Sequence, residues 1–384
     1  MIYSVSQYIL SVKHLDIMSR TLGARKIIPV YEDEKQDKLR CLVGNSVLVF
    51  QVMCGNKLMA MRVYMRPHRN LKAIYGENYY PKELLVCSNS ESYGLADVVL
   101  CDWHEGVSLQ SKIEVLADNS TQMAYLSKMF DEFAISLLNE KWAHGDLKPE
   151  NIILTDLGLK LIDFDAMYCE GLSADSCEEI GTRQYQHPLR STGLFNKSID
   201  DYPIALISTV LAALSLDSKL SKRLRDSDYL LVRPHCAVEG TDEILDYIER
   251  LFAERGDALH YRIARLLHSS TPSLPMLKLL LESQIRKVEG EEALTLEYYN
   301  GYWGFARKGI FVIPPIYDLA FEYSEGFALV RIGDVWHFID ELGNIAVTCG
   351  RGVDIKPLRN GATRMVRDDG REVVIYIDGR IEEV

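Results

Sequence analysis

The sequence lacks several features that would each define a class of protein. None of its eight cysteines forms a CxxC pair, which excludes a zinc knuckle and a thioredoxin-type redox site. Its longest apolar run, residues 204–216, is too short to cross a bilayer. The first residues contain no basic segment followed by a long apolar stretch, so we expect no secretory signal. Together these absences predict a cytoplasmic protein with free thiols.

An excess of positive charge is also missing. The 384 residues include 43 Lys plus Arg against 55 Asp plus Glu, which gives a formal net charge of −12. Binding to nucleic acid or to an anionic membrane needs clustered Lys and Arg, so we expect neither partner. The composition, 47% hydrophobic and 26% charged, is typical of a globular chain and excludes a mainly disordered one.

Changes in the hydrophobic pattern divide the chain into four parts. Residues 1–40 form a mixed N-terminal extension. Residues 41–103 contain short apolar bursts typical of strands, with a turn signal at Gly55-Asn56. Residues 104–290 have apolar positions three and four apart, which predicts helices, most clearly over 123–142, 202–216 and 243–256. Strands followed by a block of helices predict an α+β architecture.

Two short strings carry the chemistry: HGDLKPENIIL and, shortly after it, LIDFD. Asp146 can accept a proton from an attacking hydroxyl, and Lys148 places a cation near a transferring phosphoryl group. Asn151 and Asp163 offer amide and carboxylate oxygens, the ligands that Mg²⁺ prefers. Phosphoryl transfer needs mainly positioning and charge neutralisation, and these four residues supply both.

In sequence and spacing, the two strings resemble the catalytic loop and the metal-binding motif of the eukaryotic-type protein kinases. The resemblance to this family covers roughly residues 41–285. The resemblance implies a two-lobed fold with a small β-rich lobe and a large helical lobe. It implies that the backbone of Asp102 and His104, in a hinge between the lobes, meets an adenine. It also implies that Asp200 braces the catalytic loop through backbone N–H groups.

The residues that would bind the nucleotide depart from the family pattern. The family's glycine-rich phosphate loop falls on Gly44 and Ser46, and only the first of these is still glycine. Arg62 stands where the family has a phosphate-binding lysine, and Lys57 cannot replace it because strand alternation places the two on opposite faces. Arg62 is either a ligand of the α- and β-phosphates or an ion-pairing residue that supports the small lobe. Glu77 is the candidate for the glutamate that pairs with it.

The metal motif and the activation segment also depart from the family. The usual DFG is DFD here, and Asp165 is either a third metal ligand or a solvated carboxylate. Gly145 replaces the arginine that reads a phosphorylated activation loop, and Leu189 replaces an anchoring glutamate, so activation by loop phosphorylation is not expected. His144 is expected to be a buried histidine that positions the loop.

The resemblance implies an ATP- and Mg²⁺-dependent kinase that transfers the γ-phosphoryl group to Ser or Thr hydroxyls of a protein substrate. Asp146 would be the base, Lys148 would contact the γ-phosphate, Asn151 and Asp163 would hold the metal, and Arg62 would bind the α- and β-phosphates. Two alternatives stay open. One is a kinase-like scaffold without catalysis, which Arg62 and the lost glycines favour. The other is transfer of AMP, with the nucleotide bound in another orientation.

The last part of the chain, residues 295–384, contains an internal repeat. Gly301-Tyr-Trp-Gly-Phe305 recurs as Gly333-Asp-Val-Trp-His-Phe338, with a period of about 33 residues. Such a period predicts stacked units that cannot bury their apolar faces alone, so we expect an all-β repeat domain with the tryptophans in its core. The pattern resembles the WG repeats found in bacterial proteins, and this implies a bacterial source and a module that binds a protein partner.

Overall fold

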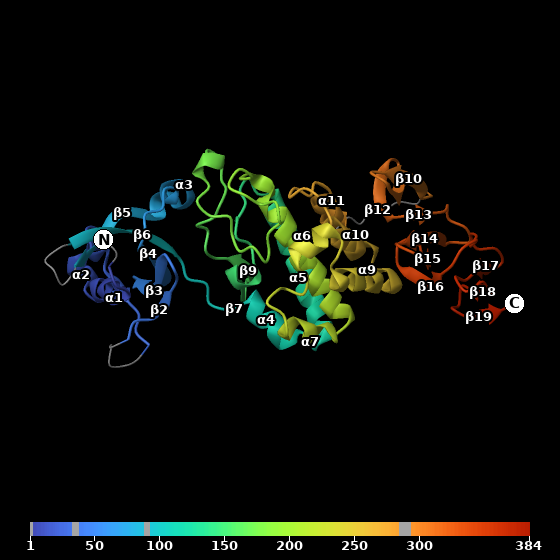
Figure 1. Cartoon of the computed structure of the whole chain (residues 1–384), viewed down its shortest axis with the longest axis horizontal. Helices are drawn as coiled ribbons and strands as arrows, with labels where there is room; N and C mark the ends of the chain where they lie inside the picture. The colour runs from blue at the N-terminus through green and yellow to red at the C-terminus, as the bar shows by residue number, and fades with distance from the viewer. Residues whose placement is uncertain (1–2, 33–37, 88–92, 284–292) are drawn as a thin grey trace.

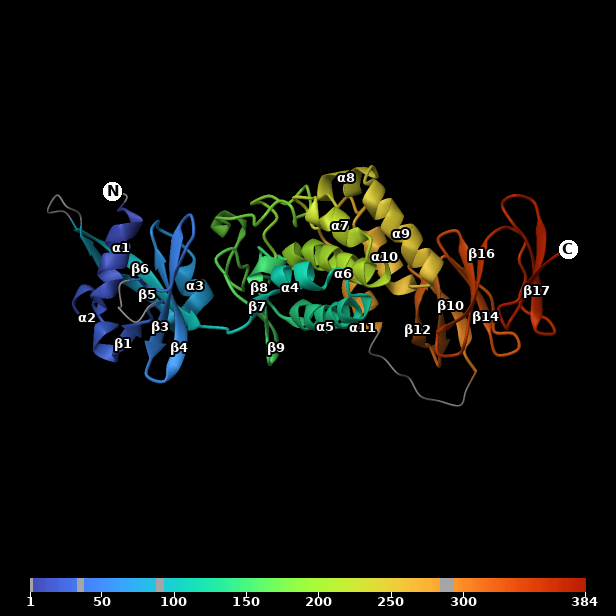
Figure 2. The ribbon, with the colours of Figure 1, turned by 90° about the horizontal axis from the view of Figure 1, so that it is seen from below.

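The computed structural model describes residues 3–32, 38–87, 93–283 and 293–384. It is elongated, and three parts follow one another along its long axis (Figure 1). A β-rich part holds the N-terminus, a helical part forms the middle, and a second β part holds the C-terminus. The perpendicular view keeps this order (Figure 2). The chain is therefore mixed α/β with an all-β C-terminal region.

The N-terminal part is built on a six-stranded antiparallel sheet. Its strands run in the order β1-β3-β4-β6-β5, and β2 pairs with β3 on the side of this path. The predicted turn at Gly55-Asn56 joins β3 to β4 and pairs Cys54 with Lys57. The strands are β1 (Ile27–Pro29), β2 (Cys41–Val43), β3 (Val47–Cys54), β4 (Lys57–Tyr64), β5 (Tyr79–Cys87) and β6 (Tyr93–Asp102).

Residues before position 40 complete the core of this sheet. Helices α1 (Val5–Lys13) and α2 (Leu15–Met18) contact β5, and their apolar side chains share one buried cluster with β3, β4 and β6. Glu83 on β5, only 3% exposed, accepts the backbone N–H of Leu22 at 2.8 Å. The first 40 residues and the sheet therefore bury their apolar surface against each other and share one core.

A long buried helix, α6 (Asp201–Leu216), forms the centre of the helical part. It is apolar on all sides because it packs against α5, α9 and α10. Within the described residues one stretch, Lys197–Leu216, is long and apolar enough to span a membrane, and 89% of its most apolar window is buried inside the protein.

The helical periodicity in the sequence is confirmed, because its three clearest stretches form α5, α6 and α9. The remaining small sheet, β7-β8-β9, lies beside the HGDLKPEN loop. The elements are β7 (Val107–Ser108), α4 (Leu109–Leu116), α5 (Ser120–Asn139), β8 (Ile152–Thr155), β9 (Gly158–Leu161), α7 (Leu220–Arg225), α8 (Pro234–Glu239), α9 (Glu243–Arg255), α10 (Ala258–Leu266) and α11 (Met276–Ser283).

Three small antiparallel sheets form the C-terminal region, in the orders β10-β11-β12, β13-β14-β15-β16 and β17-β18-β19. Trp336 and Phe338 on β15 are 6% and 1% exposed, and Trp303 packs against the main core, as predicted for the repeated aromatic residues. The strands are β10 (Thr295–Tyr299), β11 (Tyr302–Arg307), β12 (Ile310–Tyr317), β13 (Leu319–Ala320), β14 (Ala328–Ile332), β15 (Val335–Ile339), β16 (Ile345–Arg351), β17 (Ala362–Val366), β18 (Glu372–Tyr376) and β19 (Ile381–Glu383).

The C-terminal region packs directly on the helical part. Arg262 on α10 donates to the Ile316 carbonyl at 2.6 Å and lies over the Tyr302 ring. His337 on β15 donates to the Ala253 carbonyl of α9 at 2.8 Å. Apolar side chains of the first two sheets join the core of the helices, so the repeats are docked on this part. The domain boundary predicted at 290–295 falls largely outside the described residues.

Candidate functional site

The HGDLKPEN loop, residues 144–151, is held in place by hydrogen bonds from its backbone to Asp200. The two carboxylate oxygens of Asp200 accept the backbone N–H groups of His144 and Gly145, the latter at 2.9 Å. Burial raises the pKa of Asp200, while His144 and the two backbone N–H groups act in the opposite direction. His144 is itself fully buried and bonds the Ile162 carbonyl at 2.8 Å through Nε2. Both residues thus position the loop in the way the sequence predicted.

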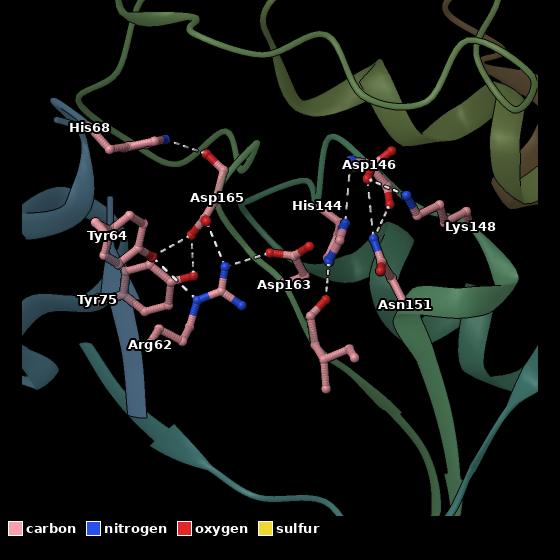
Figure 3. Close-up of polar contacts among 11 residues, drawn as sticks. Arg62, Tyr64, His68, Tyr75, His144, Asp146, Lys148, Asn151, Asp163 and Asp165 are labelled. Carbon is pink, nitrogen blue, oxygen red and sulfur yellow. Dashed lines mark hydrogen bonds and ion pairs between the residues drawn. The ribbon is translucent and has the colours of Figure 1, made fainter. Parts of the chain in front are cut away.

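Asp146 is surrounded by hydrogen-bond donors. Its Oδ2 lies 3.0 Å from Lys148 Nζ and accepts from Asn151 Nδ2 at 3.2 Å. Its Oδ1 accepts the backbone N–H of Thr182 at 2.6 Å, and Lys148 Nζ also donates to the Thr182 hydroxyl at 2.8 Å. Figure 3 shows the nitrogen ends of the Lys148 and Asn151 side chains pointing toward this carboxylate. The structure therefore brings together three of the predicted residues, and adds Thr182 from the segment after the LIDFD string.

Asp163 occupies a strained backbone position at the end of the same site. Its φ is 67°, in the left-handed region that non-glycine residues rarely adopt. The next residue, Phe164, packs against the rings of Trp142 and His144, with ring centres 5.9 and 5.1 Å apart. Backbone strain of this kind persists where the surrounding structure over-determines it, and it concentrates at functional sites.

Arg62 crosses from β4 to the LIDFD segment. Its Nη2 lies 2.6 Å from Asp163 Oδ1 and 2.6 Å from Asp165 Oδ2. The side chains of Arg62 and Asp165 are each 9% exposed, whereas that of Asp163 is 43% exposed. Burial would lower the pKa of Arg62, but Tyr75, Asp165, Tyr64 and Asp163 together raise it well above its ordinary value. The guanidinium is therefore a fixed positive charge that joins the N-terminal part to the helical part.

Both carboxylate oxygens and the backbone carbonyl of Asp165 have hydrogen-bond or ion-pair partners. Its Oδ1 accepts the hydroxyls of Tyr64 and Tyr75, both at 2.7 Å, and its backbone carbonyl lies 3.1 Å from His68 Nε2. Burial raises the pKa of both tyrosines, so they stay protonated as donors. The prediction that Asp165 is a solvated carboxylate is therefore wrong. Asp165 also has no free oxygen to offer a metal ion, because the ion pair and the hydrogen bonds occupy both carboxylate oxygens.

Two further residues lie away from the predicted partners. Glu77 pairs with Lys72 at 3.0 Å, and its side chain is 98% exposed. The prediction that it pairs with Arg62 is wrong, because helix α3 (Leu71–Tyr75) ends before it. Lys57 pairs with Asp102 at 2.5 Å, at the opposite end of β4 from the site.

The residues predicted to bind the rest of the nucleotide stand in two places, the turn between β2 and β3 and the end of β6 with the connection that follows it. Gly44 and Ser46 lie in the turn between β2 and β3, where the Gly44 N–H donates to the Val47 carbonyl at 3.0 Å and the Ser46 carbonyl accepts from Met65 at 2.8 Å. Asp102 ends β6, and His104 follows in the connection to β7. Their backbone groups carry no contact to Arg62 or Asp146 that would join them to the site.

The donor set of the predicted metal site fits Mg²⁺. Asn151 uses Nδ2 to donate to the Asp146 carbonyl at 2.9 Å, and this leaves its Oδ1 without a hydrogen bond from the described residues. Asp163 likewise keeps Oδ2 free of such contacts. Among the described residues no group of three or more His, Cys, Asp and Glu is placed to hold a metal. One carboxylate and one amide oxygen suit a Mg²⁺ ion that completes its shell with water and phosphate oxygens.

A contact that the sequence analysis missed holds the segment after the LIDFD string. Glu178 accepts from the backbone N–H and the Nε of Arg69 at 2.9 and 2.7 Å, and Asn70 Nδ2 donates to the Ser176 carbonyl at 2.6 Å. His68 adds a ring nitrogen 3.3 Å from the Glu178 carboxylate. We call this set the Glu178 clamp. No sequence motif predicts the Glu178 clamp, because the residues on its two sides are more than a hundred positions apart.

Comparison with known proteins identifies part of the C-terminal region. The WG containing repeat family matches residues 307–336, from the end of β11 to the start of β15. Among curated proteins, none matches the chain. The family match does not extend to the site described above, so it says nothing of its chemistry. The region after the helices contains a WG repeat, in agreement with the repeated Trp pattern of the sequence.

Proposed function

We propose that the protein is an ATP- and Mg²⁺-dependent phosphotransferase that modifies Ser or Thr hydroxyls of a protein substrate. The observation that carries the proposal is the environment of Asp146. Its carboxylate lies within 3.2 Å of donors from Lys148 and Asn151, in a loop that Asp200 holds in place. The resemblance of this loop to that of the protein kinases gives the arrangement its interpretation.

In this proposal each residue has one task. The substrate hydroxyl donates its proton to Asp146 as its oxygen attacks the γ-phosphorus, and the bond to the bridging oxygen of ADP breaks. Lys148 balances the negative charge of the transferred group, and Arg62 does the same for the α- and β-phosphates. Asn151 and Asp163 would hold Mg²⁺, which when bound neutralises phosphate charge. The products are a phosphoester and ADP.

A second candidate is a scaffold that binds partners through the WG repeats without catalysis. The ion pair between Arg62 and Asp163 favours it, because a carboxylate already paired at 2.6 Å must share its charge with any metal. Transfer of AMP is a third candidate on the same residues. The product separates it from the first, since AMP-modified protein would exclude transfer of the γ-phosphoryl group.

The test is the melting temperature with and without Mg²⁺-ATP, for the wild type and for Asp163→Asn. At about 100 times its dissociation constant a ligand adds about 2.7 kcal/mol of stability, a shift of a few degrees. We expect a shift that needs Mg²⁺ and disappears in Asp163→Asn, and that survives in Asp156→Asn, an exposed carboxylate in the β8–β9 turn. Transfer of the γ-phosphoryl group should then disappear in Asp146→Asn. An absent shift at saturating nucleotide would leave the scaffold as the better description.

A further inference from the structure

Arg62 presents an unused pair of donors beside the predicted metal ligand. Its Nε donates to the Tyr64 hydroxyl at 3.3 Å, and its Nη2 is shared by Asp163 and Asp165. Within the described residues its Nη1 has no hydrogen-bond partner, and it is not among the buried atoms that lack one. One edge of the guanidinium is therefore held by carboxylates, while the other is open to a ligand.

Asp165 is the group that holds this orientation. It receives Arg62 on one oxygen and the Tyr64 and Tyr75 hydroxyls on the other, at 2.6 and 2.7 Å (Figure 3). Both tyrosines come from the N-terminal part, while Asp165 follows the helical part's small sheet. The carboxylate is thus fixed by three donors from across the site.

We propose that Asp165, locked by Tyr64 and Tyr75, is the positioning residue that aims the free Nη1 edge of Arg62 at the nucleotide phosphates. The inference rests on the proposed function, and it assigns to Asp165 the place of the missing glutamate. Helix α3 is only five residues long and contributes the Tyr75 hydroxyl instead of a carboxylate.

The chemistry of arginine explains why three departures from the kinase pattern occur together. A guanidinium is a planar fork, so one edge can bind carboxylates while the other faces a phosphate. A lysine ammonium carries its three donors on one nitrogen, so it can contact a carboxylate and a phosphate but presents a flat edge to neither. Arginine at position 62 therefore suits a carboxylate supplied from position 165, and that carboxylate makes a glutamate near Glu77 unnecessary.

The test compares the affinity for Mg²⁺-ATP with that for adenosine, which lacks phosphates. In Asp165→Asn we expect roughly tenfold weaker binding of Mg²⁺-ATP and unchanged binding of adenosine, because a charge-assisted contact is lost only at the phosphates. Tyr75→Phe keeps the ion pair and should weaken Mg²⁺-ATP by a smaller factor. It serves as the readout if Asp165→Asn folds poorly. Tyr79→Phe, whose hydroxyl interacts with Asp97 outside the network, is the matched control and should change neither affinity.

A double-mutant cycle separates positioning from a structural role. If Asp165 acts through Arg62, then Arg62→Met and the double variant Arg62→Met, Asp165→Asn should bind Mg²⁺-ATP equally weakly. Additive losses, or an equal loss of adenosine binding in Asp165→Asn, would overturn the positioning role. So would a wild-type affinity for Mg²⁺-ATP in that variant. A wild type that binds no Mg²⁺-ATP at all would instead refute the proposed function, and with it the phosphate contact of Arg62.

Discussion

Gly145 lies so close to Ala166 that a Cβ atom added to the glycine would stand 2.0 Å from the Ala166 carbonyl oxygen. The backbone of Gly145 also has φ 82°, which disfavours any other residue. Its N–H is one of the two that Asp200 accepts. The glycine that the sequence analysis treated as a lost arginine is thus required by the contact between the 144–151 loop and Ala166, the residue that follows the LIDFD string.

Gly145→Ala should destabilise the protein by roughly 2–4 kcal/mol, because the left-handed conformation and the backbone overlap both act against the methyl group. Gly158→Ala is the matched control. It has φ 96° but no atom within 4 Å of the added Cβ, so it should cost only about 1–2 kcal/mol. Urea denaturation of the two variants checks the difference. Equal losses would mean that the contact with Ala166 relaxes without cost.

The Glu178 clamp should keep the segment after LIDFD closed without phosphorylation. Arg69 acts on Glu178 as a cation acts on a phosphate: burial would raise the pKa of this carboxylate, but the hydrogen bonds from Arg69 lower it. In Glu178→Ala we expect proteolytic cleavage within residues 166–181 to become roughly fivefold faster, because local opening costs less. Glu170→Ala, an exposed carboxylate in the same segment, should leave the rate unchanged. If both variants are cleaved alike, the clamp does not order the segment.

Periodicity and local strings predict much of this structure, because both depend on neighbouring residues. The helices around α6, the hairpin at Gly55-Asn56 and the repeated tryptophans follow from apolar spacing and turn chemistry. The support of the 144–151 loop by Asp200 follows from the resemblance alone. The packing of the first 40 residues on the sheet was not predicted, because the sequence of a short amphipathic helix does not show which surface its apolar face will contact.

The contacts that define the site were less predictable for a different reason. Asp165 pairs with Arg62 across 103 positions, and Glu178 with Arg69 across 109. A side chain's charge gives no information about which distant charge it meets, so Glu77 and Arg62 were paired only by analogy. The signal that could have found the true partner was present, since the added carboxylate of DFD coincides with the arginine that replaces lysine.

Arg262 should be the main anchor of the C-terminal region on the helical part. It is 3% exposed, lies 3.5 Å from the centre of the Tyr302 ring and pairs with Asp318 at 2.9 Å. Arg262→Met keeps the apolar stem but leaves Asp318 without its cation, and we expect a loss of roughly 3 kcal/mol. Hydrogen exchange should rise in β14 to β16 and stay unchanged in β3 and β4.

The control for this prediction is Arg380→Met. Arg380 also lies over an aromatic ring, 3.9 Å from the centre of Tyr376, but its side chain is 56% exposed at the far end of the repeats. Its loss should leave the exchange of β14 to β16 unchanged. Unaltered exchange in Arg262→Met as well would show that the shared apolar core alone holds the repeats.

Stability should fall at alkaline pH because of His260, which lies between two aspartates of the helical part. Its ring nitrogens are 2.7 Å from Asp257 and 3.1 Å from Asp131. Burial would lower the pKa of His260, but Asp257 and Asp131 raise it from 6.5 to about 10. A raised pKa means that the folded state holds the proton more tightly than the unfolded chain. The contribution is therefore complete below pH 6.5 and is lost as the pH rises to about 10.

Urea denaturation at pH 6.5 and at pH 9.5 measures this contribution. We expect the wild type to lose on the order of 3 kcal/mol between the two, because the unfolded chain releases this proton above pH 6.5 while the folded protein still holds it at pH 9.5. His260→Gln should be less stable at pH 6.5 and should show a flatter pH profile. His235→Gln, whose side chain is 74% exposed, should keep the wild-type profile. A wild-type profile in His260→Gln would assign the alkaline loss to other groups, and His260 would then be neutral in the folded protein.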